Sequence, residues 1–183
     1  ALSFNGNKLI TTGGGGALLT DNKKLALRAK HLSTTAKIPH QWEYNHDSIA
    51  WNDRMPNINA ALGVAQMEKL NTRLNLKRKL FNQYKNKFKS FHQIEIVETN
   101  TLDRCNNWLV TMRFLNEDKQ KAKDNCYELL RYSHSKGLLL RPSWKLLNKL
   151  DMYKNSPSGV LTNSEDQSCR LINLPSSPQL IKQ

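Results

Sequence analysis

The sequence predicts an α/β protein in two parts, the end of a larger domain followed by a small α+β domain. Residues 1–55 hold one strand–turn–strand pattern, one helix and a long loop, which are too few elements to enclose a core. Residues 92–183 alternate strand and helix patterns, as a small α+β domain requires. One long amphipathic helix over residues 56–91 connects the two parts. We therefore expect residues 1–55 to need a neighbouring sheet and residues 92–183 to have their own core.

The first part opens with two short runs of Leu, Ile and Thr around four glycines, over residues 9–20. This pattern predicts a strand, a turn and a second strand. A helical apolar spacing then predicts a helix over residues 23–32, with Thr20 or Asp21 as its N-terminal cap. Residues 33–55 show no periodicity but carry many aromatic and polar side chains. A loop of this length and composition is typically functional or packed rather than a linker.

The connecting helix has the clearest pattern in the chain. It begins at Pro56, a residue type favoured in a first helical turn. Apolar residues then recur at steps of three, four and seven, which predicts a helix over residues 57–90 with at most one break. We expect the opposite, basic face to be solvated. That face consists of Lys69, Arg73, Lys77, Arg78, Lys79, Lys85, Lys87 and Lys89.

The second part contains strand patterns over residues 94–97 and 108–115. A helix pattern follows over residues 118–136 and ends before Gly137, the usual glycine signal at a helix C-terminus. A third short strand is expected at residues 138–140, ended by a proline. Two short helical patches are expected near residues 146–152 and 164–171.

The composition narrows the choice of partners. Lys and Arg total 28 against 15 Asp and Glu, so the formal net charge is +13. This surplus suits nucleic acid, an anionic membrane surface or a small anionic ligand, and does not choose among them. No apolar run is long enough to span a bilayer and no secretory-signal pattern is present, so we expect no membrane partner. Cys105, Cys126 and Cys169 are widely spaced and odd in number, which favours reduced thiols in a cytoplasmic protein.

Two motif-like patterns have simpler explanations. The glycines at residues 13–16 lack the Lys-Ser or Lys-Thr of a nucleotide-hydrolase phosphate loop, and strand patterns flank both sides, which favours a flexible hairpin turn. His31, His40 and His46 are spaced by nine and six residues, with no cysteine or paired carboxylate to complete a site. We therefore expect no bound metal.

The basic helix face also suggests a function without catalysis. In this alternative, the chain is a module that binds nucleic acid or an acidic surface. Against this alternative, lysine dominates over arginine and no aromatic side chains interleave with the charges, as base stacking requires. By its spacing alone, Lys8 is an ordinary surface lysine. A reactive amine there would need a pKa lowered by desolvation or by a cationic neighbour.

The sequence on either side of Lys8 indicates a function for this residue. Ser-Phe-Asn-Gly-Asn-Lys at residues 3–8, followed by Thr-Thr-Gly-Gly-Gly-Gly at residues 11–16, resembles the cofactor-lysine segment of the DegT/DnrJ-type sugar aminotransferases. Asn-Ile-Asn-Ala-Ala-Leu-Gly at residues 57–63 is similar to a second segment of that family. The similarity continues in order through residues 42–47, 52–56, 141–145, 151–153 and 173–178. The resemblance implies a PLP-dependent transferase of fold type I, with this chain holding the end of its large domain and its small α+β C-terminal domain.

The resemblance also implies roles for single residues. Lys8 matches the lysine that holds pyridoxal 5'-phosphate covalently and then moves a proton between amino acid and cofactor. Ser3 matches a hydroxyl that contacts the cofactor phosphate. Asn52 and Arg54 lie in a loop that reaches the neighbouring subunit's cofactor, where either can contact the phosphate; this implies a homodimer with shared active sites. A sugar-nucleotide pocket is implied around His40, Trp42, His46, Arg141 and Trp144.

The implied activity is transamination of a nucleotide-linked 4-keto-6-deoxy sugar, with glutamate as amino donor, in surface-polysaccharide or nonulosonic-acid biosynthesis. The most similar branch acts on UDP-linked N-acetylhexosamines, and no nucleic acid partner is implied. The sequence departs from the family at Ala50, Trp51 and Asp53, and Asp53 brings a negative charge near the expected phosphate. The resemblance spans the C-terminal half of such an enzyme, so we expect this chain to be inactive by itself.

Overall fold

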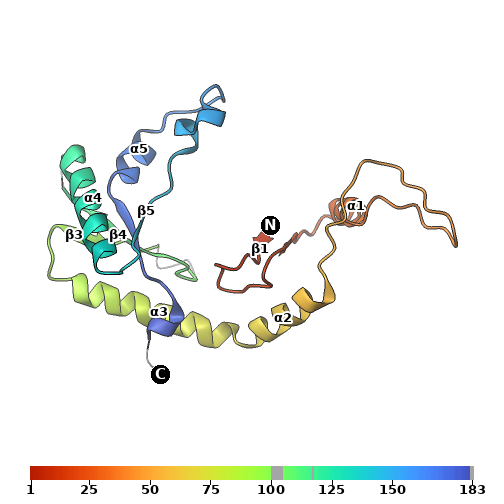
Figure 1. Ribbon diagram of the computed structural model, residues 1–183, viewed down its shortest axis with the longest axis horizontal. Helices are drawn as coiled ribbons and strands as arrows, with labels where there is room; N and C mark the ends of the chain where they lie inside the picture. Colours follow the sequence, from red (N-terminus) through yellow and green to blue (C-terminus); the bar gives the residue numbers. More distant parts are fainter. Residues whose placement is uncertain (100–104, 117, 182–183) are drawn as a thin grey trace. The chain divides into compact units, whose positions relative to one another are not determined.

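The computed structural model describes residues 1–99, 105–116 and 118–181. The chain forms two compact units, Ala1–Asn71 and Thr72–Gln183 (Figure 1). Their boundary lies within the stretch where the sequence predicts the connecting helix. Each unit is described below by itself.

The first unit opens with a two-stranded antiparallel sheet. Strand β1, Leu2–Ser3, pairs with β2, Gly16–Ala17. The prediction of a first strand within residues 9–20 is wrong, because the backbone N–H and the hydroxyl of two threonines turn this segment back toward β1. Thr12 N and Thr11 Oγ1 each donate to the Phe4 carbonyl at 3.0 Å. The first strand of the hairpin therefore precedes the Lys8 segment instead of following it.

Helix α1, Lys23–Ser33, confirms the predicted helix but not its cap. The Asn22 side chain accepts from the Leu25 N–H at 3.1 Å, and the Thr20 hydroxyl instead accepts from the Asn22 N–H. An Asn at this position satisfies one of the free N–H groups of the first turn as well as Asp does.

A loop follows α1, as predicted. Two isolated backbone bridges pair its first part with its last part. Thr34 pairs with Asn52, and Lys37 pairs with His46. Pro56 then precedes helix α2, Asn57–Glu68. The predicted long helix is broken once, at Lys69, and continues as α3, Leu70–Phe88.

The second unit contains a four-stranded antiparallel sheet with the order β3-β4-β6-β5. Strands β3, Ile94–Ile96, and β4, Val110–Phe114, lie where the sequence predicts them. The third predicted strand is shifted, since β5 is Arg141–Pro142. Strand β6, Leu171–Leu174, was not predicted, and it lies between β4 and β5. Three of its four residues are buried, so it lacks the in–out alternation that marks a half-exposed strand.

Helix α4, Lys119–Ser135, is capped by Asp118. Gly137 follows the helix with a φ of +75°, where the sequence predicts the helix to end. The predicted C-terminal patches become the short helices η1, Leu147–Lys149, and η2, Asp151–Tyr153, and helix α5, Thr162–Ser168. One more turn, η3, is Pro178–Leu180. None of the described helices is both long enough and apolar enough to cross a membrane. The core of this unit consists of Ile96, Val110, Met112, Cys126, Leu140, Ile172 and Leu174.

One residue of the predicted solvated face is buried. Lys77 on α3 is only 2% exposed. Its Nζ donates to the Trp108 carbonyl at 2.8 Å and to the Ser176 carbonyl. The expectation that Lys77 faces solvent is therefore wrong, because two backbone carbonyls from outside α3 converge on its amine.

Candidate active site

The Lys8 segment is a tight turn directly after β1. The Lys8 N–H donates to the Asn5 carbonyl at 3.0 Å, and the Gly6 N–H donates to the Asn5 side chain at 2.9 Å. Ser3 is exposed at the end of β1, and its hydroxyl accepts from the Asn5 N–H at 3.4 Å. The Lys8 residue is half-buried. Hydrogen bonds within one turn, all of which involve Asn5, therefore connect the Ser3 and Lys8 positions.

The glycine segment forms a second turn against this one. The Phe4 N–H donates to the Gly15 carbonyl at 2.9 Å. Gly13 and Gly15 have φ values of +82° and +88°, the left-handed region that residues with a Cβ rarely adopt. These glycines allow the chain to reverse between Thr12 and β2.

Helix α2 packs on the same turn. Asn59 Nδ2 donates to the Thr12 carbonyl at 2.6 Å. A Cβ at Gly63 would lie 2.9 Å from Thr12 Cγ2, so a glycine is needed for this approach. The two segments that carry the family resemblance, the lysine–glycine segment and the Asn-Ile-Asn-Ala-Ala-Leu-Gly segment, are thus in direct contact. Sequence reasoning did not identify Asn59 or Gly63 as site residues, although both lie in that second segment.

Arg54 lies beside the glycine turn. A pocket of about 580 Å³ is lined by residues 14–18, by residues 53–56 and by Asn59. Arg54 Nε donates to Asn52 Oδ1 at 3.4 Å, so the structure brings these two predicted residues together. Asp53 lines the same pocket. The residue that departs from the family pattern therefore lines the same pocket as the arginine expected to bind phosphate.

His40, Trp42 and His46 lie in the loop between α1 and α2. His40 Nδ1 accepts from the Glu43 N–H at 3.1 Å, and the rings of His40 and Trp42 meet edge to face at 5.1 Å. His46 Nδ1 donates to the Thr35 carbonyl at 2.6 Å. All three predicted residues are exposed, so these contacts shape the loop without burying it.

The same loop is also hydrogen-bonded to α1, the helix that carries His31. His31 Nε2 and Asp47 Oδ1 are 2.7 Å apart. This hydrogen bond from His31, together with one from Ser48, lowers the pKa of the Asp47 carboxyl. Among residues 1–99, 105–116 and 118–181, no group of three His, Cys, Asp or Glu side chains is arranged to hold a metal ion.

In the second unit, the predicted residues Arg141 and Trp144 are exposed on and just after β5. The Trp144 ring stacks on the Trp108 ring, with centroids 6.1 Å apart and planes 17° apart. Trp144 also lines a pocket of about 1020 Å³. The sequence analysis had not included Trp108 in the site, because only the folded chain brings it beside Trp144.

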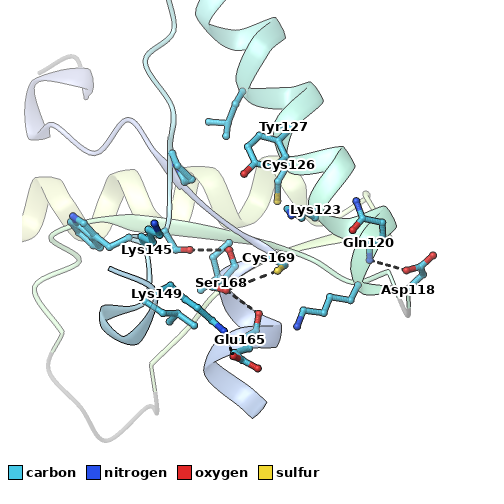
Figure 2. Close-up of a pocket in the computed structure, with 17 residues that line it drawn as sticks. Asp118, Gln120, Lys123, Cys126, Tyr127, Lys145, Lys149, Glu165, Ser168 and Cys169 are labelled. Carbon is cyan, nitrogen blue, oxygen red and sulfur yellow. Dashed lines mark hydrogen bonds and ion pairs between the residues drawn. The ribbon is translucent and has the colours of Figure 1, made fainter. Parts of the chain in front are cut away.

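This larger pocket lies between the start of α4, the segment after β5, and α5 (Figure 2). Asp118 is used as the cap of α4, and Glu165 pairs with Lys149 at 3.1 Å. The three other lysines that line the pocket form no ion pair with any described residue. They are Lys119, Lys123 and Lys145.

Two thiols on the pocket wall differ in burial. Cys126 on α4 is 6% exposed, whereas Cys169 after α5 is half-buried. Burial raises the pKa of the Cys126 thiol to about 11. Cys126 is therefore a protonated, unreactive thiol near neutral pH, and the wall of the pocket gains its positive charge from lysines alone.

Comparison with known proteins gives consistent matches over nearly the whole chain. GDP-perosamine synthase of Escherichia coli O157:H7 is 32% identical over 178 residues, 97% of this chain and 46% of that protein. The UDP-4-amino-4,6-dideoxy-N-acetyl-beta-L-altrosamine transaminase of Campylobacter jejuni is 24% identical over 153 residues, 83% of this chain and 40% of that protein. The chain spans about half the length of the curated relatives it matches.

The fold of this chain is also similar to solved structures. Helicobacter pylori PseC, an aminotransferase involved in the biosynthesis of pseudoaminic acid, has a TM-score of 0.88 at 24% identity. The match covers 99% of this chain and 49% of that one. This likeness identifies the fold as that of the fold type I sugar aminotransferases. The sequence pattern of the DegT/DnrJ/EryC1/StrS aminotransferase family matches residues 1–183, and this chain is a member of that family.

Proposed function

We propose that the protein containing this chain is an aminotransferase that uses pyridoxal 5'-phosphate to transfer an amino group to a nucleotide-linked 4-keto-6-deoxy sugar. The observation that carries the proposal is the frame around Lys8. Phe4 joins the Lys8 turn to the glycine turn, and Asn59 joins the glycine turn to α2. A catalytic amine needs such a preorganised frame. Because the chain matches about half of each relative, the activity is assigned to a protein in which the other half of the fold is also present.

The residues of the first unit suit this cofactor, on which aminotransferases of the family depend. A phosphate needs hydrogen-bond donors and positive charge, and the unit offers the Ser3 hydroxyl and the Arg54 guanidinium on exposed segments. Arg54 contacts the neutral Asn52 side chain and forms no ion pair with a described carboxylate. Its charge is therefore available to an anion, against the opposing charge of Asp53.

The proposed chemistry assigns one proton transfer to Lys8. Its Nζ would accept the proton that leaves the α-carbon of the amino donor, for which we propose glutamate, and would pass that proton to the reacting carbon of the cofactor within the same half-reaction. Pyridoxal phosphate, when bound, supplies the electron sink for the electron pair left on that carbon. Ser3 and Arg54 would hold the phosphate, so that the proton acceptor and the reacting carbon would keep a constant geometry.

For the second substrate we propose a UDP-linked N-acetylhexosamine, bound with Arg141 and Trp144. The pocket beside Trp144 supports an anionic ligand, because three of its lysines have no described carboxylate partner. The net charge of +13 also suits a nucleotide diphosphate. We place the activity in the cytoplasm, in the synthesis of surface polysaccharides or nonulosonic acids, which fits three free thiols. Comparing kcat/KM for UDP-linked and GDP-linked keto sugars tests the choice of nucleotide.

The Lys8→Ala variant of the complete protein tests the proposed function. We expect it to remain folded but to lose transamination and the visible absorbance of the covalently held cofactor. Borohydride reduction followed by peptide mass spectrometry should place the cofactor on Lys8 in the wild type. Lys24→Ala, an exposed lysine on α1, is the matched control and should keep both properties. Activity and a reducible cofactor bond retained in Lys8→Ala would remove Lys8 from this role.

The proposed homodimer has a separate test. If Arg54 of one subunit serves the cofactor of its partner, an inactive Lys8→Ala subunit and an inactive Arg54→Ala subunit complement each other when mixed. Each heterodimer then contains one site with both residues intact. Recovery of activity after subunit exchange supports a shared site, and no recovery despite demonstrated exchange argues for a site built within one subunit.

A further inference from the structure

Lys77 connects the backbone beside two neighbouring strands at one end of the sheet in the second unit. Its Nζ donates to the Trp108 carbonyl, just before β4, and to the Ser176 carbonyl, just after β6. Strands β4 and β6 are neighbours, and Val110 pairs with Leu174 at this end. The Ser176 hydroxyl also links β4 and β6 at this end, because it accepts from the Val110 N–H at 2.8 Å and donates to the Leu174 carbonyl at 2.7 Å.

The same α3 face holds the segment after β6 at a second point. Two helical turns beyond Lys77, the Tyr84 hydroxyl donates to the Pro175 carbonyl at 2.9 Å. With Tyr84 already attaching that segment to α3, the distinctive contact of Lys77 is the one with Trp108. This contact fixes the backbone of the residue whose ring stacks on Trp144.

A charged side chain is a costly way to fill this position. Taking an ammonium group out of water costs several kcal/mol, which an apolar side chain would avoid, but an apolar side chain would leave the Trp108 and Ser176 carbonyls without this donor. The two carbonyl contacts recover only part of that cost, as the lowered pKa of Lys77 indicates. What the amine provides and a methyl group does not is a fixed direction for the Trp108 carbonyl.

We infer that Lys77 is a positioning residue for the sugar-nucleotide pocket: through the Trp108 backbone it sets the ring of Trp144 that forms part of the pocket wall. This inference rests on the proposed function, in which Trp144 contacts the nucleotide sugar. Lys77 touches neither substrate nor cofactor in this arrangement. Its effect reaches the ligand only through the two stacked indoles.

The test compares Lys77→Met with Lys79→Met in the complete protein. Lys79 is exposed on the same helix and provides a control for charge and helix propensity. In Lys77→Met we expect the KM for the nucleotide sugar to rise about tenfold, the equivalent of one weakened contact. The half-reaction with the amino donor, followed by cofactor absorbance, should stay within about twofold of the wild type. The near-UV circular dichroism of the stacked indoles should weaken, whereas Lys79→Met should leave all three readouts unchanged.

Trp108→Leu is a second variant that tests the inference even if Lys77→Met does not fold. It should raise the same KM, and the double variant should show no further increase, because both changes act through one path. A melting temperature that falls while the KM stays constant would overturn the inference, and so would additive effects on the KM.

Trp144→Ala separates this inference from the proposed function. If Trp144→Ala raises the KM but Lys77→Met does not, the proposed pocket stands and the positioning role is wrong. If Trp144→Ala leaves the KM unchanged, the pocket assignment and the positioning role are both wrong. A raised KM in Trp144→Ala, Trp108→Leu and Lys77→Met together supports both.

Discussion

Asn59 Nδ2 donates a hydrogen bond of 2.6 Å to the backbone carbonyl of Thr12, which lies 47 residues earlier in the chain. This bond connects helix α2 to the turn between the Lys8 segment and the glycine segment. Thr12 is only 2% exposed, so water has little access to its carbonyl if Asn59 is lost. The position of the glycine turn therefore depends on α2, the helix that carries the Asn-Ile-Asn-Ala-Ala-Leu-Gly segment.

Replacing Asn59 should loosen this turn. In Asn59→Ala the buried Thr12 carbonyl loses its partner, and we expect the free energy of unfolding to fall by about 1–3 kcal/mol. Urea denaturation measures this change, and cofactor titration should show a weaker affinity in the same variant. Asn57→Ala, at the exposed first position of α2, is the control. Equal losses in both variants would mean that only the helix, and not the contact with Thr12, matters.

Gly16→Ala should disturb the site from the opposite side. A Cβ at Gly16 would collide with the Leu2 carbonyl, which is backbone and has little freedom to move. We expect β1 to shift away from β2, with a destabilisation of about 1–3 kcal/mol and weaker cofactor binding, because Ser3 and the Lys8 turn move with β1. Gly14→Ala is a matched control, since its Cβ meets no atom within 4 Å. Thermal unfolding and cofactor titration of the two variants test the difference, and identical behaviour would contradict it.

Lys77 should give the protein a recognisable pH dependence. Burial lowers its pKa from 10.5 to about 8, and the Coulombic interaction with Cys105 acts in the opposite direction. Between pH 8 and pH 10.5 the unfolded chain keeps a proton that the folded chain has released, so the free energy of unfolding rises with pH. Relative to Lys77→Met, the wild type should gain up to about 3 kcal/mol over this window. Urea denaturation at pH 7.5, 9 and 10.5 measures the difference, and a constant difference would show that Lys77 is not desolvated.

Local sequence signals determined where helices α2 and α4 begin and where α4 ends. Pro56 before α2, Asp118 before α4 and Gly137 after α4 act within one helical turn, so a single stretch of sequence contains the whole signal. The family resemblance likewise pointed to Lys8, Ser3, Asn52 and Arg54 as one proposed site. Of the geometry around them, the sequence indicated only that the lysine and glycine segments are neighbours along the chain.

The tertiary structure alone decided which distant segments meet. Strand β6 became a central strand because β4 and β5 pair with its two edges, and neither pairing is visible in its four residues. Lys77 has the spacing of a solvated lysine, yet its partners Trp108 and Ser176 lie 31 and 99 residues away. The same holds for the stacking of Trp108 on Trp144 and the bond from Asn59 to Thr12. Hydrogen bonds and ring contacts depend on distance in space, and only the folded backbone sets that distance for residues so far apart along the chain.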